Sequence, residues 1–219
     1  MFSFVLAGFL GYLLGSIPTA YLLVHWKSRL DIRSAGSGNV GTLNSYEVTG
    51  SYLVGAAVLA VDAAKGIAAV AASGVLPGHD FALQACAGFF AILGHNFSVW
   101  IRFRGGRGLA AAAGVFSMFC WPLVPVWGAL WAGAYLILKE VNPANAVASI
   151  IIPVLIALAP GPLLSRFAPG GVGRGEFALF AAVSMIVVLM KHLEPVRAYI
   201  GKRRKSADRP HDTGGTENR

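Results

Sequence analysis

The stretch GLAAAAGVFSMFCWPLVPVWGALWAGAYLIL, residues 108–138, decides how this chain folds. It is almost wholly apolar and too long for one upright membrane-spanning helix, which needs about 20 residues. Pro122 and Pro125 lie in its middle, and proline breaks helices because it has no N–H group. The stretch is therefore either one long helix or two helices that meet near residues 120–122.

The composition of the whole chain is that of a membrane protein. Of its 219 residues, 56% are hydrophobic and 13% are charged, and the mean hydropathy is +0.64. Soluble domains have about 25% charged residues. Apolar runs in lipid must form helices, because no water is present to satisfy their backbone groups. The first run is followed, not preceded, by basic residues, so we expect an uncleaved span and no signal peptide.

Seven apolar helices are expected in a single domain, residues 1–200. Gly15-Ser16-Ile17-Pro18 places a helix breaker inside the first, so we expect a kink there. A basic tail, residues 201–219, is expected to be disordered. The helices are predicted over residues 2–25, 50–75, 81–101, 108–120, 122–138, 144–163 and 176–191.

The distribution of positive charge favours two helices in residues 108–138. Seven spans then run from an outside N-terminus to a cytoplasmic C-terminus, and 15 of the 18 Lys and Arg residues lie inside. Arg166 and Arg174 lie outside, and Lys65 lies within a span. A single helix would put Lys139 and the basic tail outside, against the positive-inside rule. The predicted fold is an all-α integral membrane protein, a seven-helix bundle. The net charge of +8 fits a membrane surface, and no nucleic-acid partner is expected.

The first polar loop reads SAGSGNVGTLN, residues 34–44. Glycine permits close backbone approach, and Ser37, Asn39 and Asn44 offer short hydrogen-bonding side chains, so the loop suits an anion or a polyol. The alternative is a solvated turn, with Asn44 capping the next helix.

The second polar loop ends the stretch GHNFSVWIRFRGGRG, residues 94–108. Gly105, Gly106, Arg107 and Gly108 lead directly into a helix, whose N-terminal N–H groups attract phosphate, as guanidinium groups do. The alternative is a basic loop that only sets topology, with small residues for helix packing. His95 and Asn96 precede the loop and could be interfacial polar groups.

Two further pairs of polar residues lie in or beside predicted spans. Asp62 and Lys65 share one helix face, either as a structural ion pair or at a polar cavity. Lys191 and His192 close the last span, where such a pair can also be a simple boundary feature. Cys86 and Cys120 lie in apolar stretches and look like core residues, so no disulfide or metal site is expected.

These motifs together resemble the PlsY-type acyl-phosphate:glycerol-3-phosphate acyltransferases of bacteria. The likeness lies in GYLLGSIPTAYLL of the first helix, GSGNVGTLN, Asp62 with Lys65, GHNF, FRGGRG and the closing Lys191-His192. It implies a seven-helix protein of the inner membrane whose active site faces the cytoplasm. It also implies transfer of a fatty acyl group from acyl phosphate to the 1-hydroxyl of glycerol 3-phosphate, without cofactor or metal. The expected partners are these two substrates and the lipid bilayer.

The resemblance also implies roles for individual residues. Ser37 and His192 are the expected catalytic residues, His192 for proton transfer or phosphate contact, and a substrate phosphate acting as the base remains an alternative. The expected substrate-binding residues are Asn39, Asn44, Asp62, Lys65, His95, Asn96, Gly105, Gly106, Arg107, Gly108 and Lys191.

The chain departs from the family pattern at five positions. Glu47 replaces an arginine, Arg107 a lysine, Ala111 a threonine, Lys191 an arginine and Pro195 an asparagine. Arginine and lysine are not equivalent at phosphate sites. A divergent enzyme acylating another polar acceptor is therefore one alternative. A transporter of small anions or phosphate esters is another, since broken helices and buried charges also mark transport sites. The oligomeric state and acyl-chain preference stay open.

Overall fold

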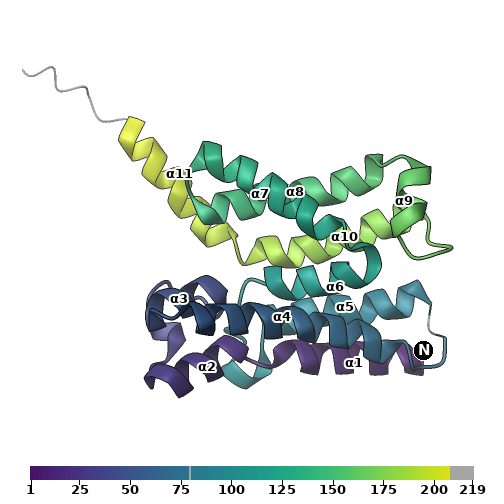
Figure 1. The fold of residues 1–219 in the computed structure, drawn as a ribbon, viewed down its shortest axis with the longest axis horizontal. Helices are drawn as coiled ribbons and strands as arrows, with labels where there is room; N and C mark the ends of the chain where they lie inside the picture. The colour runs from purple at the N-terminus through teal and green to yellow at the C-terminus, as the bar shows by residue number, and fades with distance from the viewer. Residues whose placement is uncertain (79, 208–219) are drawn as a thin grey trace, which may run out of the picture.

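The computed structural model describes residues 1–78 and 80–207, and the elements of the described chain are all helices, joined by turns and loops (Figure 1). The first expected span is broken where proline predicts a break. α1 (Phe2–Ser16) ends just before Ile17 and Pro18, and α2 (Thr19–Ser28) continues beyond them. The predicted kink is confirmed.

The decisive stretch forms two helices, as the charge argument predicts. α6 (Leu109–Cys120) and α7 (Leu123–Leu138) are separated by Trp121 and Pro122. The remaining elements are η1 (Ile32–Ser34), α3 (Thr42–Thr49), α4 (Tyr52–Ser73), α5 (Phe81–Asn96), η2 (Val99–Ile101), α8 (Val141–Leu158), α9 (Gly161–Phe167), α10 (Arg174–Met190) and α11 (Leu193–Ala207).

Each of the seven expected apolar helices is present, but they differ in length. Four segments of the described chain are long and apolar enough to cross a membrane, namely Phe2–Ser28, Tyr52–Ser73, Phe81–Ile101 and Val141–Leu158. The helices Arg174–Met190 and Leu193–Lys205 meet at a bend of 62° and add a fifth segment only when the two are counted as one broken span. α6 and α7 are shorter.

Several expected boundaries were wrong. The third helix ends at Asn96 instead of residue 101, because the chain turns there into η2. α8 starts at Val141 instead of residue 144, since Pro143 is tolerated in a first helical turn. α3 was not among the predicted helices, and its first three residues belong to the expected first polar loop. Residues 201–207, expected to be disordered, belong to α11, and residues 208–219 of that tail lie outside the described residues.

Small residues let the helices pack closely in pairs. A Cβ atom on Gly11 or Gly15 of α1 would collide with the backbone of Ala87 or Ala91 in α5. Likewise, Gly66 of α4 and Gly114 of α6 each meet the backbone of the other helix. These contacts are typical of membrane helices, which associate through packing between small residues.

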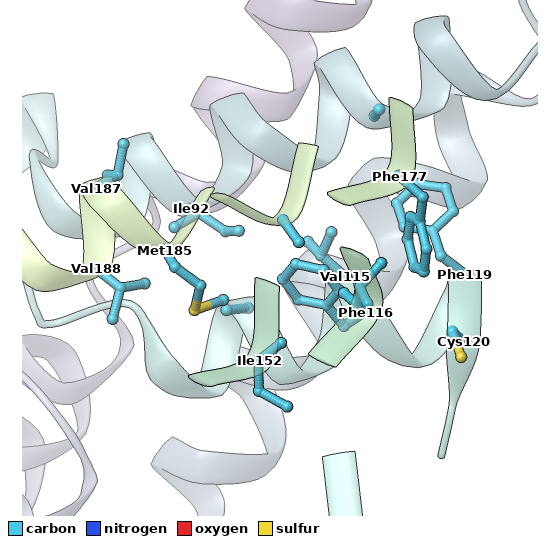
Figure 2. Close-up of a cluster of buried hydrophobic side chains, with 14 of the residues drawn as sticks. Ile92, Val115, Phe116, Phe119, Cys120, Ile152, Phe177, Met185, Val187 and Val188 are labelled. Atoms are coloured by element: carbon cyan, nitrogen blue, oxygen red, sulfur yellow. The ribbon is translucent and has the colours of Figure 1, made fainter. Parts of the chain in front are cut away.

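A buried apolar cluster joins α5 and α6 to α8 and α10 (Figure 2). Its large members include Phe116, Phe119 and Phe177, with Ile152 and Met185 beside them. The cluster fixes α6 against the later helices. One end of the bundle, on the left in Figure 1, holds the two polar loops, the α7–α8 turn and the start of α11.

Candidate functional site

The first polar loop is organised from within by Asn44. Its side-chain Nδ2 donates to the carbonyl oxygens of Ile32, Ala35 and Asn39 at 3.3, 3.1 and 2.9 Å, and its Oδ1 accepts from the Ser37 N–H at 2.9 Å. Asn44 is 1% exposed and lies inside α3, whereas Ser51 caps α4. The alternative of Asn44 as a helix cap is therefore wrong, and the residue holds the loop in shape.

The second polar loop packs against the C-terminal end of α5. The N–H of Gly106 donates to the carbonyl oxygen of His95 at 3.0 Å. A Cβ atom on Gly105 or Gly106 would collide with His95, and one on Gly108 would collide with the side chain of Asn96. Gly108 also has a φ of +86°, a value that favours glycine. The three glycines are thus needed for this close approach.

Behind this loop, Asp62 and Lys65 form a buried cluster with His95. Lys65 Nζ lies 2.9 Å from Asp62 Oδ1 and donates to the Ile17 carbonyl oxygen at 2.9 Å. His95 Nδ1 lies 3.6 Å from the same carboxylate oxygen. The three side chains are at most 7% exposed. The ion pair has a structural role, because its Lys65 joins α4 to the break between α1 and α2.

The two loops and the turn between α10 and α11 enclose a polar cavity of about 270 Å³, called here the loop cavity. Basic side chains from three separate stretches face it, together with glycines and short polar groups of both loops. Its lining residues are Arg33, Ser37, Gly38, Asn39, Phe103, Arg104, Gly105, Gly106, Arg107, Lys191, Glu194 and Pro195.

The cations of the loop cavity are not equivalent. Arg33 pairs with Asp31 at 2.6 Å, and its guanidinium lowers the pKa of that carboxyl to about 2. Lys191 Nζ lies 4.5 Å from the centre of the Phe97 ring. Arg107 is half-buried, and burial lowers its pKa while Glu194 and Glu47 raise it. An arginine stays protonated under such shifts. Arg107 therefore keeps its positive charge, with no carboxylate within salt-bridge distance among the described residues.

His192 lies behind the loop cavity and does not line it. The side chain is 1% exposed, with Nδ1 2.9 Å from the Val188 carbonyl oxygen and Nε2 3.4 Å from Asn145 Nδ2. Asn96 is also fully buried, and it donates to the Val187 carbonyl oxygen at 2.9 Å. Both side chains tie α10 to its neighbours.

The expected site residues thus fall into two groups. Ser37, Asn39, Gly105, Gly106, Arg107 and Lys191 meet at the loop cavity. The rest lie behind that cavity or at its edge and shape it, namely Asn44, Asp62, Lys65, His95, Asn96, Gly108 and His192.

An apolar groove of about 320 Å³ begins just beyond the second loop. Leu109, two residues after Arg107, is one of its lining residues. α4, α6, α7, α8 and α10 contribute the others, which are Leu59, Ala110, Ala112, Ala113, Phe116, Leu123, Val124, Trp127, Gly128, Ile152 and Met185. At the start of α6, the lining of the polar cavity and that of the apolar groove are therefore only two residues apart along the chain.

Sequence reasoning missed two asparagines in the first two turns of α8. Asn142 Oδ1 accepts a hydrogen bond from Arg107 at 2.6 Å, and Asn145 contacts His192. The only signal in the sequence was two polar amides, three residues apart, in an otherwise apolar helix. Arg33 and Glu194 were also missed, since neither belongs to a glycine-rich motif.

Comparison with known proteins agrees with this geometry. A family model described as glycerol-3-phosphate acyltransferase matches residues 5–202. The glycerol-3-phosphate acyltransferase of Nitrobacter winogradskyi is 36% identical over 187 residues, 85% of this chain and 87% of the relative. Glycerol-3-phosphate acyltransferase 5 of Dehalococcoides mccartyi is 34% identical over 200 residues, 90% and 81% of the two chains.

Solved structures give the same result. The crystal structure of PlsY (YgiH), an integral membrane glycerol 3-phosphate acyltransferase, in its glycerol 3-phosphate form has a TM-score of 0.76 and 26% identity to this chain. The match covers 92% of this chain and 94% of that one. A second crystal structure, of the lysophosphatidic acid form, has a TM-score of 0.75. The chain is an all-helical integral membrane protein and belongs to the glycerol-3-phosphate acyltransferase family.

Proposed function

We propose that this chain transfers a fatty acyl group from acyl phosphate to the 1-hydroxyl of glycerol 3-phosphate. The products are lysophosphatidic acid and orthophosphate. The observation that supports this proposal best is the junction at α6, where Arg107 lines a cationic cavity and Leu109 an apolar groove. Such a junction suits a substrate with a phosphate at one end and a hydrocarbon tail at the other.

Acyl phosphate is a mixed anhydride, so its carbonyl carbon is already activated. The acceptor hydroxyl adds to that carbon, the bond from the carbonyl carbon to the phosphate oxygen breaks, and phosphate leaves with the electron pair. The enzyme must mainly hold two anionic substrates in contact. Positioning of this kind can lower a barrier by about 7–11 kcal/mol. Arg107 and Lys191 are proposed to offset the repulsion between the two phosphates.

Ser37 and Asn39 are proposed to orient the glycerol hydroxyls, because both line the loop cavity beside the glycines. The hydroxyl proton needs an acceptor within hydrogen-bond reach. His192 is buried behind the cavity, with both ring nitrogens near protein partners. We therefore favour a substrate phosphate as the proton acceptor, with His192 supporting the wall of the site.

The same proposal fixes an orientation in the membrane. Seven spans, with the N-terminus outside and the loop cavity facing the cytoplasm of a bacterial cell, satisfy the positive-inside rule. Residues 1–200 form the acyltransferase domain in this proposal. Cysteine substitutions at Ser37 and Arg203 should react with a membrane-impermeant reagent only in inverted vesicles. Labelling of position 37 from the periplasmic side would reject the orientation.

The activity is tested with purified protein, palmitoyl phosphate and labelled glycerol 3-phosphate, without coenzyme A. We expect labelled lysophosphatidic acid and an equal amount of orthophosphate. If product forms only with palmitoyl coenzyme A, the proposed donor is wrong. Pro195 lines the loop cavity where the family has asparagine, which favours one alternative, a different polar acceptor. Orthophosphate release with another polyol phosphate, but not with glycerol 3-phosphate, would support that alternative.

A further inference from the structure

The start of α8 contacts two separate parts of the candidate site. Asn142 Oδ1 accepts a hydrogen bond of 2.6 Å from an Arg107 guanidinium nitrogen. Three residues later on the same helix face, Asn145 Nδ2 lies 3.4 Å from His192 Nε2. One helical turn therefore links the loop before α6 to the turn after α10.

The chemistry at Asn142 suits a residue that holds a cation for a ligand. An arginine side chain loses considerable conformational entropy when it is fixed, so a preformed contact lowers the cost of binding phosphate. An amide oxygen fixes the guanidinium without neutralising it, whereas a carboxylate would compete with the phosphate. Among the described residues, Arg107 makes no other hydrogen bond, so its remaining N–H groups are available to a ligand.

The contact of Asn145 fixes a second group of the site, the imidazole of His192. A carbonyl oxygen can only accept, so the contact with Val188 requires the proton on His192 Nδ1. The neutral ring then has a lone pair on Nε2, which can accept from Asn145 Nδ2. Asn145 is 7% exposed and His192 is 1% exposed. The pair thus holds the imidazole in one orientation and one tautomer, away from solvent.

We propose that Asn142 and Asn145 are positioning residues for the acyl transfer, acting through Arg107 and His192 respectively. The inference rests on the proposed function, in that Arg107 is taken to bind a substrate phosphate. α8 is then part of the phosphate site even though neither asparagine lines the loop cavity.

The test for Asn142 is a double-mutant cycle with Arg107. Asn142→Ala should raise the KM for glycerol 3-phosphate or acyl phosphate about 10-fold, the usual scale for one hydrogen bond to a charged group, with little change in kcat. Asn142→Asp should raise the same KM further, because the carboxylate neutralises the positive charge of Arg107. Asn142→Ser, which keeps an oxygen acceptor, should recover part of the loss. In an Arg107→Ala background, Asn142→Ala should have no further effect.

The test for Asn145 has the same form. Asn145→Ala should lower kcat/KM several-fold, and the loss should disappear in a His192→Gln background. Ser73→Ala is the matched control. The Ser73 hydroxyl is also buried, and it donates to the Val70 carbonyl oxygen at the C-terminal end of α4, outside the loop cavity. This control variant should leave KM and kcat unchanged. Effects that add fully in both cycles would overturn the proposal, as would a fall in thermal stability without a change in KM.

A binding measurement separates this inference from the reaction itself. Labelled glycerol 3-phosphate and labelled orthophosphate can be titrated onto purified wild type and Asn142→Ala protein, with no acyl donor present. About 10-fold weaker binding of either probe to the variant supports the positioning role even if the reaction uses another donor. Equal binding of both probes to the two proteins would reject it, whatever the activity assay shows.

Discussion

Lys65 donates a hydrogen bond to the carbonyl oxygen of Ile17, at the point where the first span breaks. The helix breaks at Pro18, so the Ile17 carbonyl oxygen has left the regular helical pattern, and it accepts from the Thr19 N–H at 3.0 Å as well as from Lys65. The same ammonium group pairs with Asp62. The break and the ion pair therefore depend on each other, and together they support the wall behind the second loop.

Removing Lys65 should destabilise the protein more than removing the whole pair. Lys65→Met leaves the Asp62 carboxylate buried without a counter-ion, which typically costs about 3–5 kcal/mol. Asp62→Asn combined with Lys65→Met should regain much of that loss. Thermal unfolding in detergent measures both. Equal melting temperatures for the single and the double variant would show that the pair is not coupled.

Removing Arg107 should weaken substrate binding far more than removing Arg203. Arg107 lines the loop cavity, whereas Arg203 lies on α11 over the ring of Tyr199. Losing a charge-assisted hydrogen bond costs about 1.5–3 kcal/mol, so Arg107→Ala should raise the KM for a phosphorylated substrate by roughly 10- to 100-fold. Steady-state kinetics with both substrates varied gives the answer. Similar KM values for Arg107→Ala and Arg203→Ala would remove Arg107 from the site.

A methyl group at Gly106 should disrupt the second loop. A Cβ atom there would collide with the His95 ring and would lie 2.5 Å from the carbonyl oxygen of Val40. We expect Gly106→Ala to lower transfer activity by at least about 100-fold, since a displacement of about 1 Å can have that effect. Gly170→Ala is the control, because a Cβ atom at that position has no neighbour within 4 Å. Normal turnover by Gly106→Ala would contradict the packing described here.

Two asparagines of the first loop should behave differently. Asn44→Ala removes the side chain that bonds four backbone groups, so the variant should lose both stability and kcat/KM. Asn39→Ala should raise the KM for glycerol 3-phosphate with little loss of stability, since Asn39 lines the cavity. Melting temperatures and kinetics of the two variants decide this. The assignment fails if Asn39→Ala is the less stable of the two.

Filling the apolar groove should change which acyl chains are used. Ala113 lines the groove and is only partly buried, so Ala113→Phe should obstruct a long chain more than a short one. The ratio of kcat/KM for palmitoyl phosphate to that for octanoyl phosphate should fall. Steady-state kinetics with each donor, on the wild type and the variant, gives this ratio. An unchanged ratio would place the acyl chain elsewhere.

The helices of this protein could be predicted from local signals. Pro18 and Pro122 end helices because proline has no N–H group, and the distribution of Lys and Arg distinguished two helices from one in residues 108–138. Glycine-rich loops marked the stretches that meet at the loop cavity. These signals depend on neighbours in the sequence, so they can be recognised without the fold.

The direction of individual side chains could not be predicted in the same way. Asn44 and Asn39 belong to one motif, yet one faces the backbone of its own loop and the other faces the cavity. Asn142 became visible as a partner of Arg107 only when packing brought α8 beside the second loop. Such contacts join residues that are far apart in sequence, and a single sequence carries no record of the distance between them.

The central claim is that two distant loops and the α10–α11 turn form one cationic cavity that binds the phosphates of both substrates, including that of glycerol 3-phosphate. A crystal structure of this protein with glycerol 3-phosphate tests it most directly. We predict the phosphate in the loop cavity, with an oxygen about 2.7–2.9 Å from an Arg107 guanidinium nitrogen and the glycerol hydroxyls beside Ser37 and Asn39. A phosphate bound at the opposite end of the bundle, or out of reach of Arg107, would contradict the account.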